Sequence, residues 1–449
     1  MILGLFLGYK DLVVTPAYLF VIGILIFYFK KFVPNKDLKP IFIRAFFAKI
    51  FSGIMLGVIY QFYYGGGDTS TYFYDGERLA DVFYQSKIAW FKMVFLSMKI
   101  DEDTFPFYHN IFCWGDYQSY FVVRVLGIFN LLSFNTYTAS AIFFAVFSFN
   151  GIWHMFLTFR ALYPHLEKQI ANACFFLPSL IFWGSGILKD SLLVCGIGWA
   201  FYAAVHVIFL KKKALKSFIL LAAASIILMN VKPFVLVALM PSLLIWIIFS
   251  RIQKVKSSFG RTIYGPIIFV ILFSLGFVFL SRFTKDTYFD VTRAEEITQS
   301  IKVSKDFLLY VAQNQNGSAY DIGEMDGSVS NAASLAPKAI WVTFFRPYPW
   351  ESKNINMMMA ALESFFFIVF TARTLYRVGI FKTLGIIGSN PFVLFCLTYS
   401  MFYGAVIGLS SANFGTLVRY KIPILPFYLV AFIVIDSYKK EKKVSEFVT

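Results

Sequence analysis

The amino-acid sequence predicts an all-α membrane protein, a polytopic bundle of about eleven transmembrane helices with interfacial helices in its first outer loop. Of the 449 residues, 58% are hydrophobic and only 15% are charged, whereas ordinary soluble domains carry about 25% charged residues. The apolar residues recur in runs near the length that crosses a bilayer. We therefore expect a single transmembrane domain over residues 1–449, with the lipid bilayer as its surroundings.

The net charge of +16 comes from short clusters of Lys and Arg between the apolar runs. This placement fits the positive-inside rule better than a surface for nucleic acid, so no nucleic-acid partner is expected. The four cysteines show neither a disulfide framework nor a metal-binding spacing. The N-terminal stretch MILGLFLGYKDLVV lacks a basic start and a convincing cleavage site, and we expect it to remain uncleaved.

Eleven spans are expected in chain order. The fourth is short and runs into GSGILKD, and the sixth and seventh form a hairpin hinged at NVKP. The expected spans are 12–29, 41–62, 137–159, 170–183, 188–210, 218–231, 234–249, 263–280, 357–372, 391–409 and 422–435.

Two connections are long and polar, 63–134 and 281–356. Within the first, the apolar stretch 120–134 is short for a span and is interrupted by Arg124, so we expect a helix lying in the membrane interface. Every second connection is short and basic. That alternation places the N-terminus outside and the C-terminus in the cytoplasm, as in a multi-pass membrane protein.

The stretch YYGGGDTSTYFYDGERLAD, residues 63–81, follows the second span. Its three consecutive glycines let the backbone bend sharply and approach a ligand closely. Four carboxylates follow the glycines: Asp68, Asp75, Glu77 and Asp81. The plain alternative is a solvated loop whose acids have no role beyond solubility.

The expected topology brings further charged residues to the same outer face. A charge at the membrane costs several kcal/mol unless it is paired or reaches the surface. Taken singly, each cation has an ordinary explanation as an anchor for its helix, but the group forms a basic element beside an acidic one. Besides the four carboxylates of 63–81, the residues expected at this face are Lys189, Asp190, Lys232, Arg346, Trp350, Glu351, Arg419 and Lys421.

This combination suits the transfer of a sugar from a lipid phosphate. Arginine and lysine bind a phosphate and stabilise the charge that grows on it as it leaves. A carboxylate on the other side of the sugar removes the proton of the acceptor hydroxyl. Asp68 is the candidate base because it follows the glycines, and Asp75 is the second candidate.

The loop element GGGDTSTYFYDGE resembles that of the GT-C superfamily of integral membrane glycosyltransferases, in which an essential acidic residue lies early in a long first outer loop. FWGSGILKD, RPYPWE and NFGTLVRYKIPILPF are similar to blocks of bacterial envelope-polysaccharide membrane proteins. The resemblance covers the architecture of most of the chain. It implies a polyprenyl-phosphate-linked sugar donor, a glycan, lipid or protein acceptor, and Asp68 as base. The chain departs from the usual family pattern in an additional N-terminal helix, and it lacks the large C-terminal soluble domain of some members.

Three other functions are compatible with the pattern: an O-antigen-type polysaccharide polymerase or ligase, a flippase or transporter of a lipid-linked glycan, and a non-catalytic membrane scaffold. A transporter favours charges near the bilayer midplane on broken helices of matching halves, whereas here they gather at one face. No cofactor is required by the sequence. Asp68 together with Asp75 or Glu77 is compatible with a divalent ion, Mg²⁺ or Mn²⁺, beside a phosphate.

Overall fold

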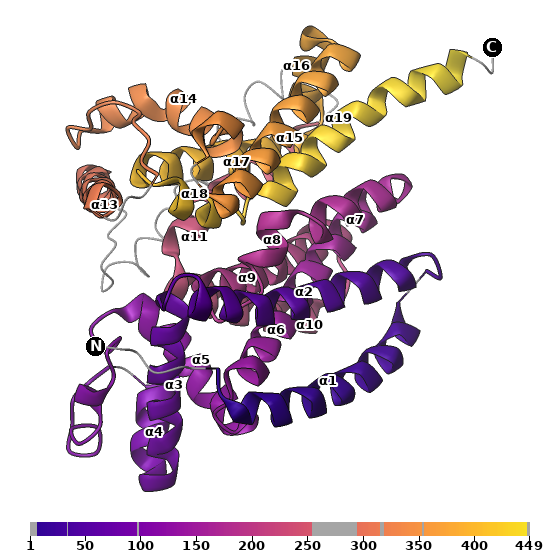
Figure 1. Cartoon of the computed structure of the whole chain (residues 1–449). Helices are drawn as coiled ribbons and strands as arrows, with labels where there is room; N and C mark the ends of the chain where they lie inside the picture. Colours follow the sequence, from indigo (N-terminus) through magenta and orange to yellow (C-terminus); the bar gives the residue numbers. More distant parts are fainter. Residues whose placement is uncertain are drawn as a thin grey trace. The chain divides into compact units, whose positions relative to one another are not determined.

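The structure is a computed structural model that describes residues 7–33, 35–96, 98–253, 294–314, 318–352 and 354–446. Within these ranges the regular structure is helical, without strands, and a single isolated β-bridge joins Ala319 and Asn413. The chain divides into two compact units. Figure 1 labels the helices of both. Unit 1 is Met1–Leu162 with Cys174–Lys232, and unit 2 is Tyr163–Ala173 with Pro233–Thr449. The expectation of one transmembrane domain stays a prediction.

Unit 1 contains the first ten α-helices apart from most of α7. Its elements are α1 (Tyr9–Phe29), η1 (Lys30–Phe32), α2 (Leu38–Phe62), α3 (Asp68–Gln85), α4 (Lys87–Phe95), η2 (Tyr108–Asn110), α5 (Tyr117–Ser133), α6 (Tyr137–Leu162), the end of α7 (Glu167–Phe175), α8 (Pro178–Phe182), α9 (Lys189–Val205), the π-helical turn η4 (His206–Leu210) and α10 (Ala214–Val231).

Unit 2 contains the start of α7 and the later helices. Its elements are η3 (Pro164–Leu166), α11 (Pro233–Ile252), α13 (Ala294–Asn314), α14 (Val329–Phe345), η5 (Pro349–Glu351), α15 (Ile355–Val378), α16 (Ile380–Ser389), α17 (Pro391–Ser410), α18 (Phe414–Tyr420) and α19 (Leu425–Glu446).

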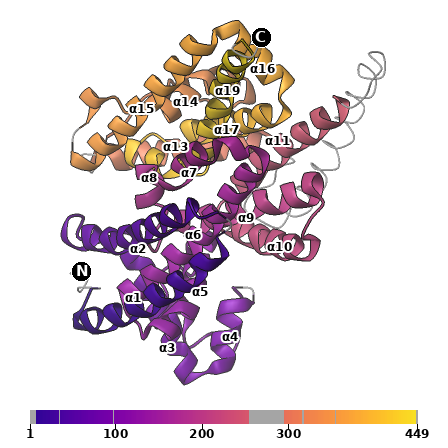
Figure 2. The ribbon, with the colours of Figure 1, turned by 90° about the vertical axis from the view of Figure 1, so that its right-hand side faces the viewer.

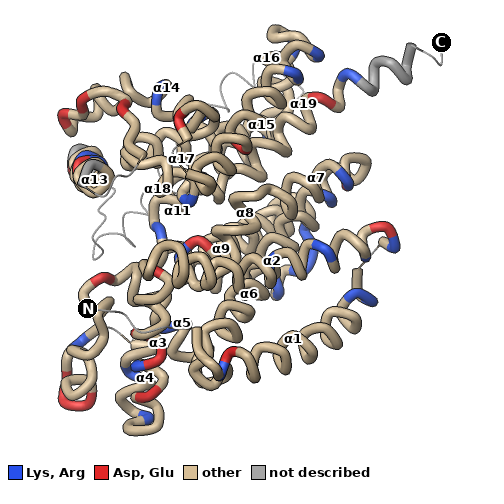
Figure 3. The backbone as a smooth tube through the Cα atoms, viewed as in Figure 1, with Lys and Arg blue, Asp and Glu red and all other residues tan. Residues whose placement is uncertain are grey.

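Eight of the described helices are long and apolar enough to cross a membrane: α1 with η1, α2, α6, α9 with η4, α10, α11, α15 and α17. Each coincides with an expected span, which supports a multi-pass membrane protein. Most of the eleventh expected span lies in α19, which forms with α18 a pair bent by 66°, the geometry of a broken span or of a re-entrant loop. Charged residues gather at the ends of the long helices and in the connections (Figure 3).

The count of about eleven spans is not confirmed. The expected span 170–183 is divided between α7 and α8, of nine and five residues. Pro178 opens α8, and Leu177 before it is extended with ψ 123°, because proline lacks an N–H and disfavours the helical conformation in the residue before it. The expected span 263–280 lies outside the described residues.

Close backbone contact joins α6 and α9 in unit 1. A Cβ atom on Gly198 would lie 2.0 Å from the carbonyl oxygen of Gly151, and one on Gly151 would lie 2.3 Å from Cα of Cys195. Small residues at a crossing let membrane helices approach to van der Waals contact of their backbones. These positions therefore fix α9, whose first turn carries two of the expected site residues.

Helices α3, α4 and α5 of the first long connection, 63–134, pack together (Figures 1 and 2). The expected helix at 120–134 is present as α5, but Tyr120, Val123 and Leu126 are fully buried in it. The exposed apolar face belongs to α4, where Phe91 and Phe95 are 53% and 55% exposed. Helices in this loop are thus confirmed, and their position in the membrane interface stays a prediction.

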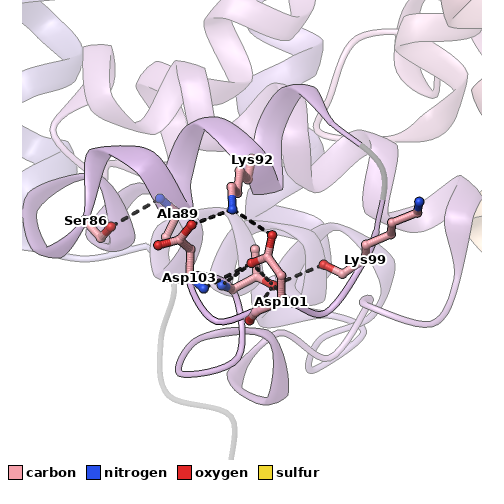
Figure 4. Close-up of polar contacts among 7 residues, drawn as sticks. Ser86, Ala89, Lys92, Lys99, Asp101 and Asp103 are labelled. Atoms are coloured by element: carbon pink, nitrogen blue, oxygen red, sulfur yellow. Dashed lines mark hydrogen bonds and ion pairs between the residues drawn. The ribbon is translucent and has the colours of Figure 1, made fainter.

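A charged contact holds the chain after α4 against that helix. The ammonium of Lys92 contacts Asp101 at 2.7 Å and also Asp103, as Figure 4 shows. Oδ1 of Asp101 accepts hydrogen bonds from the backbone N–H groups of Asp103 and Thr104, at 3.1 and 3.0 Å. The contacts of Lys92 neutralise the one charge in the middle of α4 and fold residues 101–104 into a tight turn.

In unit 2, α14 crosses α17 closely. The hydroxyl of Thr343 donates to the carbonyl of Gly404 at 2.8 Å, and a Cβ on Gly408 would lie 2.4 Å from the carbonyl oxygen of Ala339. The chain before α14 is tied to the start of α18, since Phe414 N–H donates to the Ser318 carbonyl at 2.9 Å. The described part of the second long loop thus packs against the last spans.

Candidate functional site

Asp68 is the first residue of α3 and is exposed. The three glycines before it have φ values of 70°, 129° and 140°, which side chains other than hydrogen rarely tolerate. Two hydrogen bonds define the turn: Gly66 N–H donates to the Tyr60 carbonyl at 2.8 Å, and Gly67 N–H donates to Oγ of Ser70 at 3.0 Å. The glycine turn therefore ends α2 abruptly and presents Asp68 on the first turn of α3.

Tyr60 connects this turn with the segment that leads to α9. Its ring lies against Gly67, where a Cβ would be 2.8 Å from Cε1 of Tyr60. On another side the ring meets Trp183 edge-on, with 6.4 Å between centroids. Trp183 opens the WGSGILKD stretch that ends at Lys189 and Asp190. The glycine turn before Asp68 and the segment 183–190 thus both meet the ring of Tyr60.

Asp75 is 1% exposed and serves as an anchor. Its two carboxylate oxygens accept the backbone N–H groups of Phe112 at 3.0 Å and Cys113 at 2.7 Å, and Nη1 of Arg78 at 3.2 Å. These donors account for the burial of a carboxylate. The catalytic role of Asp75 stays a prediction, while its contacts show what it does in the fold: it fixes the segment around Cys113 to α3.

Lys189, the first residue of α9, lies 3.6 Å from Oδ2 of Asp116. Asp116 also caps α5, because its Oδ1 accepts the N–H groups of Gln118 and Ser119 at 3.0 and 3.3 Å. Partial burial raises the pKa of Asp116, but the hydrogen bond from the Ser119 hydroxyl and the charge of Lys189 outweigh it and lower the pKa. Asp116 is therefore an anion that places the Lys189 ammonium.

Asp190 and Lys232 form a buried ion pair, with 3.3 Å between Oδ1 and Nζ. Asp190 lies in the first turn of α9, where the helix dipole favours a carboxylate. Lys232 follows the last residue of α10. The structure thus brings together two residues that the sequence analysis expected on one face, and it places the Lys189–Asp116 pair one residue away along α9.

Arg346 in unit 2 pairs with Glu351. Its Nε lies 3.1 and 3.2 Å from the two carboxylate oxygens, and its Nη2 also contacts Oε1. Burial raises the pKa of Glu351, but the Arg346 hydrogen bonds and the 2.7 Å bond from Tyr348 N–H lower it overall. The guanidinium also lies over the ring of Phe414, 5.1 Å from its centroid.

Lys421 is linked to Arg346 through one hydroxyl. Its ammonium donates to Oγ of Ser364 at 3.0 Å, and that hydroxyl donates to the Arg346 carbonyl at 2.9 Å. Lys421 is 1% exposed, and Glu363, which interacts with its charge, is 6% exposed. This expected phosphate ligand is therefore buried beside a carboxylate. Arg419 is half-buried in the last turn of α18.

A cavity of about 460 Å³ lies beside Arg346 in unit 2. Trp341 and Tyr348 form an aromatic wall, joined by a 2.8 Å hydrogen bond from Nε1 of Trp341 to the tyrosine hydroxyl. Trp350, which is 78% exposed, stacks on Tyr348. The residues that line the cavity are Asp321, Ile322, Pro337, Lys338, Trp341, Val342, Arg346 and Tyr348.

Lys338 and Asp321 are charged cavity residues that the sequence analysis missed, and Lys338 adds a second cation beside Arg346. The Lys338 side chain is exposed, and within the described residues no hydrogen bond or ion pair engages its ammonium. A lysine inside the apolar stretch LAPKAIWVTFF was a usable signal, since a charge in such a stretch calls for an explanation. Asp116 and Glu363 were also missed. Glu363 offered the same kind of signal, since it is a lone acid inside the apolar helix α15.

The expected site residues form two groups, one in each unit. Unit 1 holds Asp68, Asp75, Lys189, Asp190 and Lys232, and unit 2 holds Arg346, Trp350, Glu351, Arg419 and Lys421. The meeting of both groups around one substrate stays a prediction.

No cluster of three or more His, Cys, Asp or Glu side chains in the described ranges is arranged to bind a metal ion. Both oxygens of Asp75 accept hydrogen bonds from protein donors, so a Mg²⁺ or Mn²⁺ ion bound there would compete with these bonds. No step of the chemistry below depends on a divalent ion.

No protein-family model, curated protein or solved structure matches this chain. Its chemistry is therefore inferred from its own residues.

Proposed function

We propose that the protein is a GT-C-like membrane glycosyltransferase that moves a sugar from a polyprenyl-phosphate carrier to an acceptor on the outer side of a bacterial cytoplasmic membrane. The observation that carries this proposal is the cavity of unit 2. Two cations, Lys338 and Arg346, face one space together with Trp341 and Tyr348. A sugar phosphate offers an anion to the cations and an apolar ring face to the aromatic side chains.

Arg346 suits the phosphate because a guanidinium offers several N–H donors in a fixed plane. Glu351 engages Nε and Nη2, which leaves Nη1 for a ligand and fixes the plane of the group. Lys338 adds a mobile point charge. Both cations stabilise the negative charge that develops on the phosphate as the glycosidic bond breaks, an effect that typically contributes 10²–10³-fold per donor.

Asp68 acts as the base in this proposal. The acceptor hydroxyl oxygen bonds to the anomeric carbon, the bond from that carbon to the phosphate oxygen breaks, and the phosphate leaves with the electron pair. Asp68 takes the hydroxyl proton, which contributes about 10²–10⁴-fold. A phosphate leaves as a stable anion, so no general acid is required. The exposed first turn of α3 gives Asp68 access to an acceptor.

The test uses the full chain in proteoliposomes, with radiolabelled glucosyl, mannosyl and arabinosyl undecaprenyl phosphates as donors and total membrane glycolipid as acceptor. Asp68→Asn is expected to abolish transfer and keep donor binding, and Arg346→Gln is expected to weaken donor binding. Arg377→Gln is the matched control, because Arg377 also pairs with an acid, Asp436 at 3.1 Å, but at the far end of α15.

Full activity of Asp68→Asn would show that Asp68 is not the base. Equal losses in Arg346→Gln and Arg377→Gln would show that the Arg346 effect is structural. The length of the product separates a transferase from an O-antigen-type polymerase, since a transferase makes single additions and a polymerase makes a ladder. Movement of the donor across the bilayer that survives Asp68→Asn would indicate a flippase instead.

A further inference from the structure

A second cavity, of about 640 Å³, lies in the first long connection of unit 1. One wall is a face of α3, where the lining positions follow the i, i+3, i+4, i+7 spacing of a single helix face. The opposite wall is the chain from 106 to 111. The lining residues are Arg78, Asp81, Val82, Gln85, Pro106, Phe107, His109, Asn110 and Ile111.

The second wall is fixed to the first by the anchor described above. Asp75 on α3 accepts the N–H groups of Phe112 and Cys113, and Nη1 of Arg78 donates to the Asn110 carbonyl at 2.8 Å. The anchor is buried, since Asp75 is 1% exposed. The two walls therefore keep their separation without a ligand, which reduces the cost of ordering them on binding.

The polar groups of the cavity are balanced between donors and acceptors. Arg78 uses only Nη1 in the contacts above, and Asp81 uses Oδ1 to accept Nδ2 of Asn135 at 3.1 Å. Within the described residues, no hydrogen bond engages the side-chain amides of Gln85 and Asn110. Both amides offer donors and acceptors together.

The charges of Arg78 and Asp81 cancel, whereas the unit 2 cavity is lined by two cations, Lys338 and Arg346, and one carboxylate, Asp321. A phosphate would gain little here, because the carboxylate repels it. A ligand with many hydroxyls would match the set, since each hydroxyl both donates and accepts. Phe107 and Pro106 add an apolar part to the same cavity, which suits the C–H face of a sugar ring.

We propose that this cavity binds the acceptor of the transfer reaction and that the acceptor is a neutral glycan. The inference rests on the proposed glycosyltransferase activity and adds the substrate class of its second site. Asp68 and Arg78 lie on the same helix, ten residues and thus about 15 Å apart along its axis. A glycan of several units bound in the cavity extends along α3 and presents its end to the base.

The experiment measures glycan binding without transfer, on the full chain with Asp68→Asn in lipid nanodiscs. Saturation-transfer NMR with chitotetraose, isomaltotetraose and mannotetraose provides the probes, and inorganic phosphate is the competitor. At least one tetrasaccharide is expected to bind, and phosphate is not expected to displace it. Asp81→Ala and Gln85→Ala are expected to weaken binding about five- to tenfold each, as for loss of one hydrogen bond.

Tyr84→Ala is the matched control, because Tyr84 is an exposed residue of α3, at 74%, that does not line the cavity. The Tyr84→Ala variant is expected to bind the glycans with the same affinity as the parent chain. Absence of binding by all three glycans, displacement by phosphate, or unchanged binding in both cavity variants would overturn the proposal. Glycan binding without transfer from any polyprenyl donor would instead overturn the transferase and leave a glycan-binding protein.

Discussion

The ammonium of Lys232 lies 3.3 Å from Oδ1 of Asp190, and the two residues are only 8% and 1% exposed. The pair joins the end of α10 to the start of α9. Removing one partner of a buried ion pair costs far more than replacing both, because it leaves the other charge buried without that partner.

Lys232→Met is therefore expected to lower the free energy of unfolding by about 3–5 kcal/mol, measured by denaturant titration in detergent micelles. The double variant Lys232→Met with Asp190→Leu is expected to recover most of that loss. Lys189→Met is the control, since its partner Asp116 is more than half exposed, and its loss is expected to be smaller. Equal effects of the single and double variants would exclude coupling of the pair.

The two candidate bases on α3 are expected to respond differently to the same substitution. Asp75→Asn replaces an acceptor oxygen by an amide donor and leaves a buried N–H without its partner, at a cost of about 1–3 kcal/mol. Faster hydrogen exchange at the Phe112 and Cys113 amides provides the measurement. Asp68→Asn is expected to leave the exchange of these two amides unchanged and to remove activity. Protected amides in Asp75→Asn would contradict the anchor.

The glycine turn supports a second matched comparison. Gly67 has φ 140°, and a Cβ there would meet the Tyr60 ring at 2.8 Å, whereas Gly65 has φ 70° and open space around it. Gly67→Ala is expected to lower stability by about 1–3 kcal/mol and to reduce transfer by displacing Asp68. Gly65→Ala is expected to cost about 1 kcal/mol. Thermal unfolding and the transfer assay check both, and equal effects would exclude the Tyr60 contact as the cause.

The turn after α4 is expected to depend on pH. The hydrogen bond from Lys92 and that from Thr104 N–H lower the pKa of Asp101 from 3.8 to about 2. A carboxyl group whose pKa is lower in the folded state stabilises that state above its unfolded pKa, and this contribution is lost as pH falls through the folded value. The contact is thus expected to hold at pH 5 and to weaken between pH 4 and 2.

Hydrogen exchange at the Asp103 and Thr104 amides, corrected for the intrinsic rate at each pH, follows that loss. Lys92→Met provides the control, because it is expected to show fast exchange already at pH 5. Identical protection at pH 5 and pH 2 in the parent chain would refute a role for the Asp101 charge.

The eight membrane helices were predictable because hydrophobicity over about 20 residues is a local property of the chain. The break of the span 170–183 was less evident, although Pro178 marks it. The break is stabilised by a residue from a distant part of the sequence, which no local pattern reveals. The ammonium of Lys49 in α2 donates to the Leu180 and Gly184 carbonyls at 3.0 and 2.6 Å. Those bonds satisfy backbone groups that a continuous helix would satisfy itself.

The candidate site was predictable only in part for the same reason. Residue type and topology pointed to Lys232, Asp190, Arg346 and Glu351, but no pattern encodes a pairing over a long stretch of chain. Asp190 is 42 positions from Lys232. The cavity around Arg346 also depends on how α14 and the following turn fold, and that is decided by tertiary packing.

The 66° bend between α18 and α19 has a consequence for the backbone groups at the bend. Residues 421–425 at the bend are all buried in protein. Irregular backbone at membrane depth persists only where protein or water, rather than acyl chains, surrounds it. The burial of residues 421–425 therefore shields the irregular backbone of the bend from acyl chains.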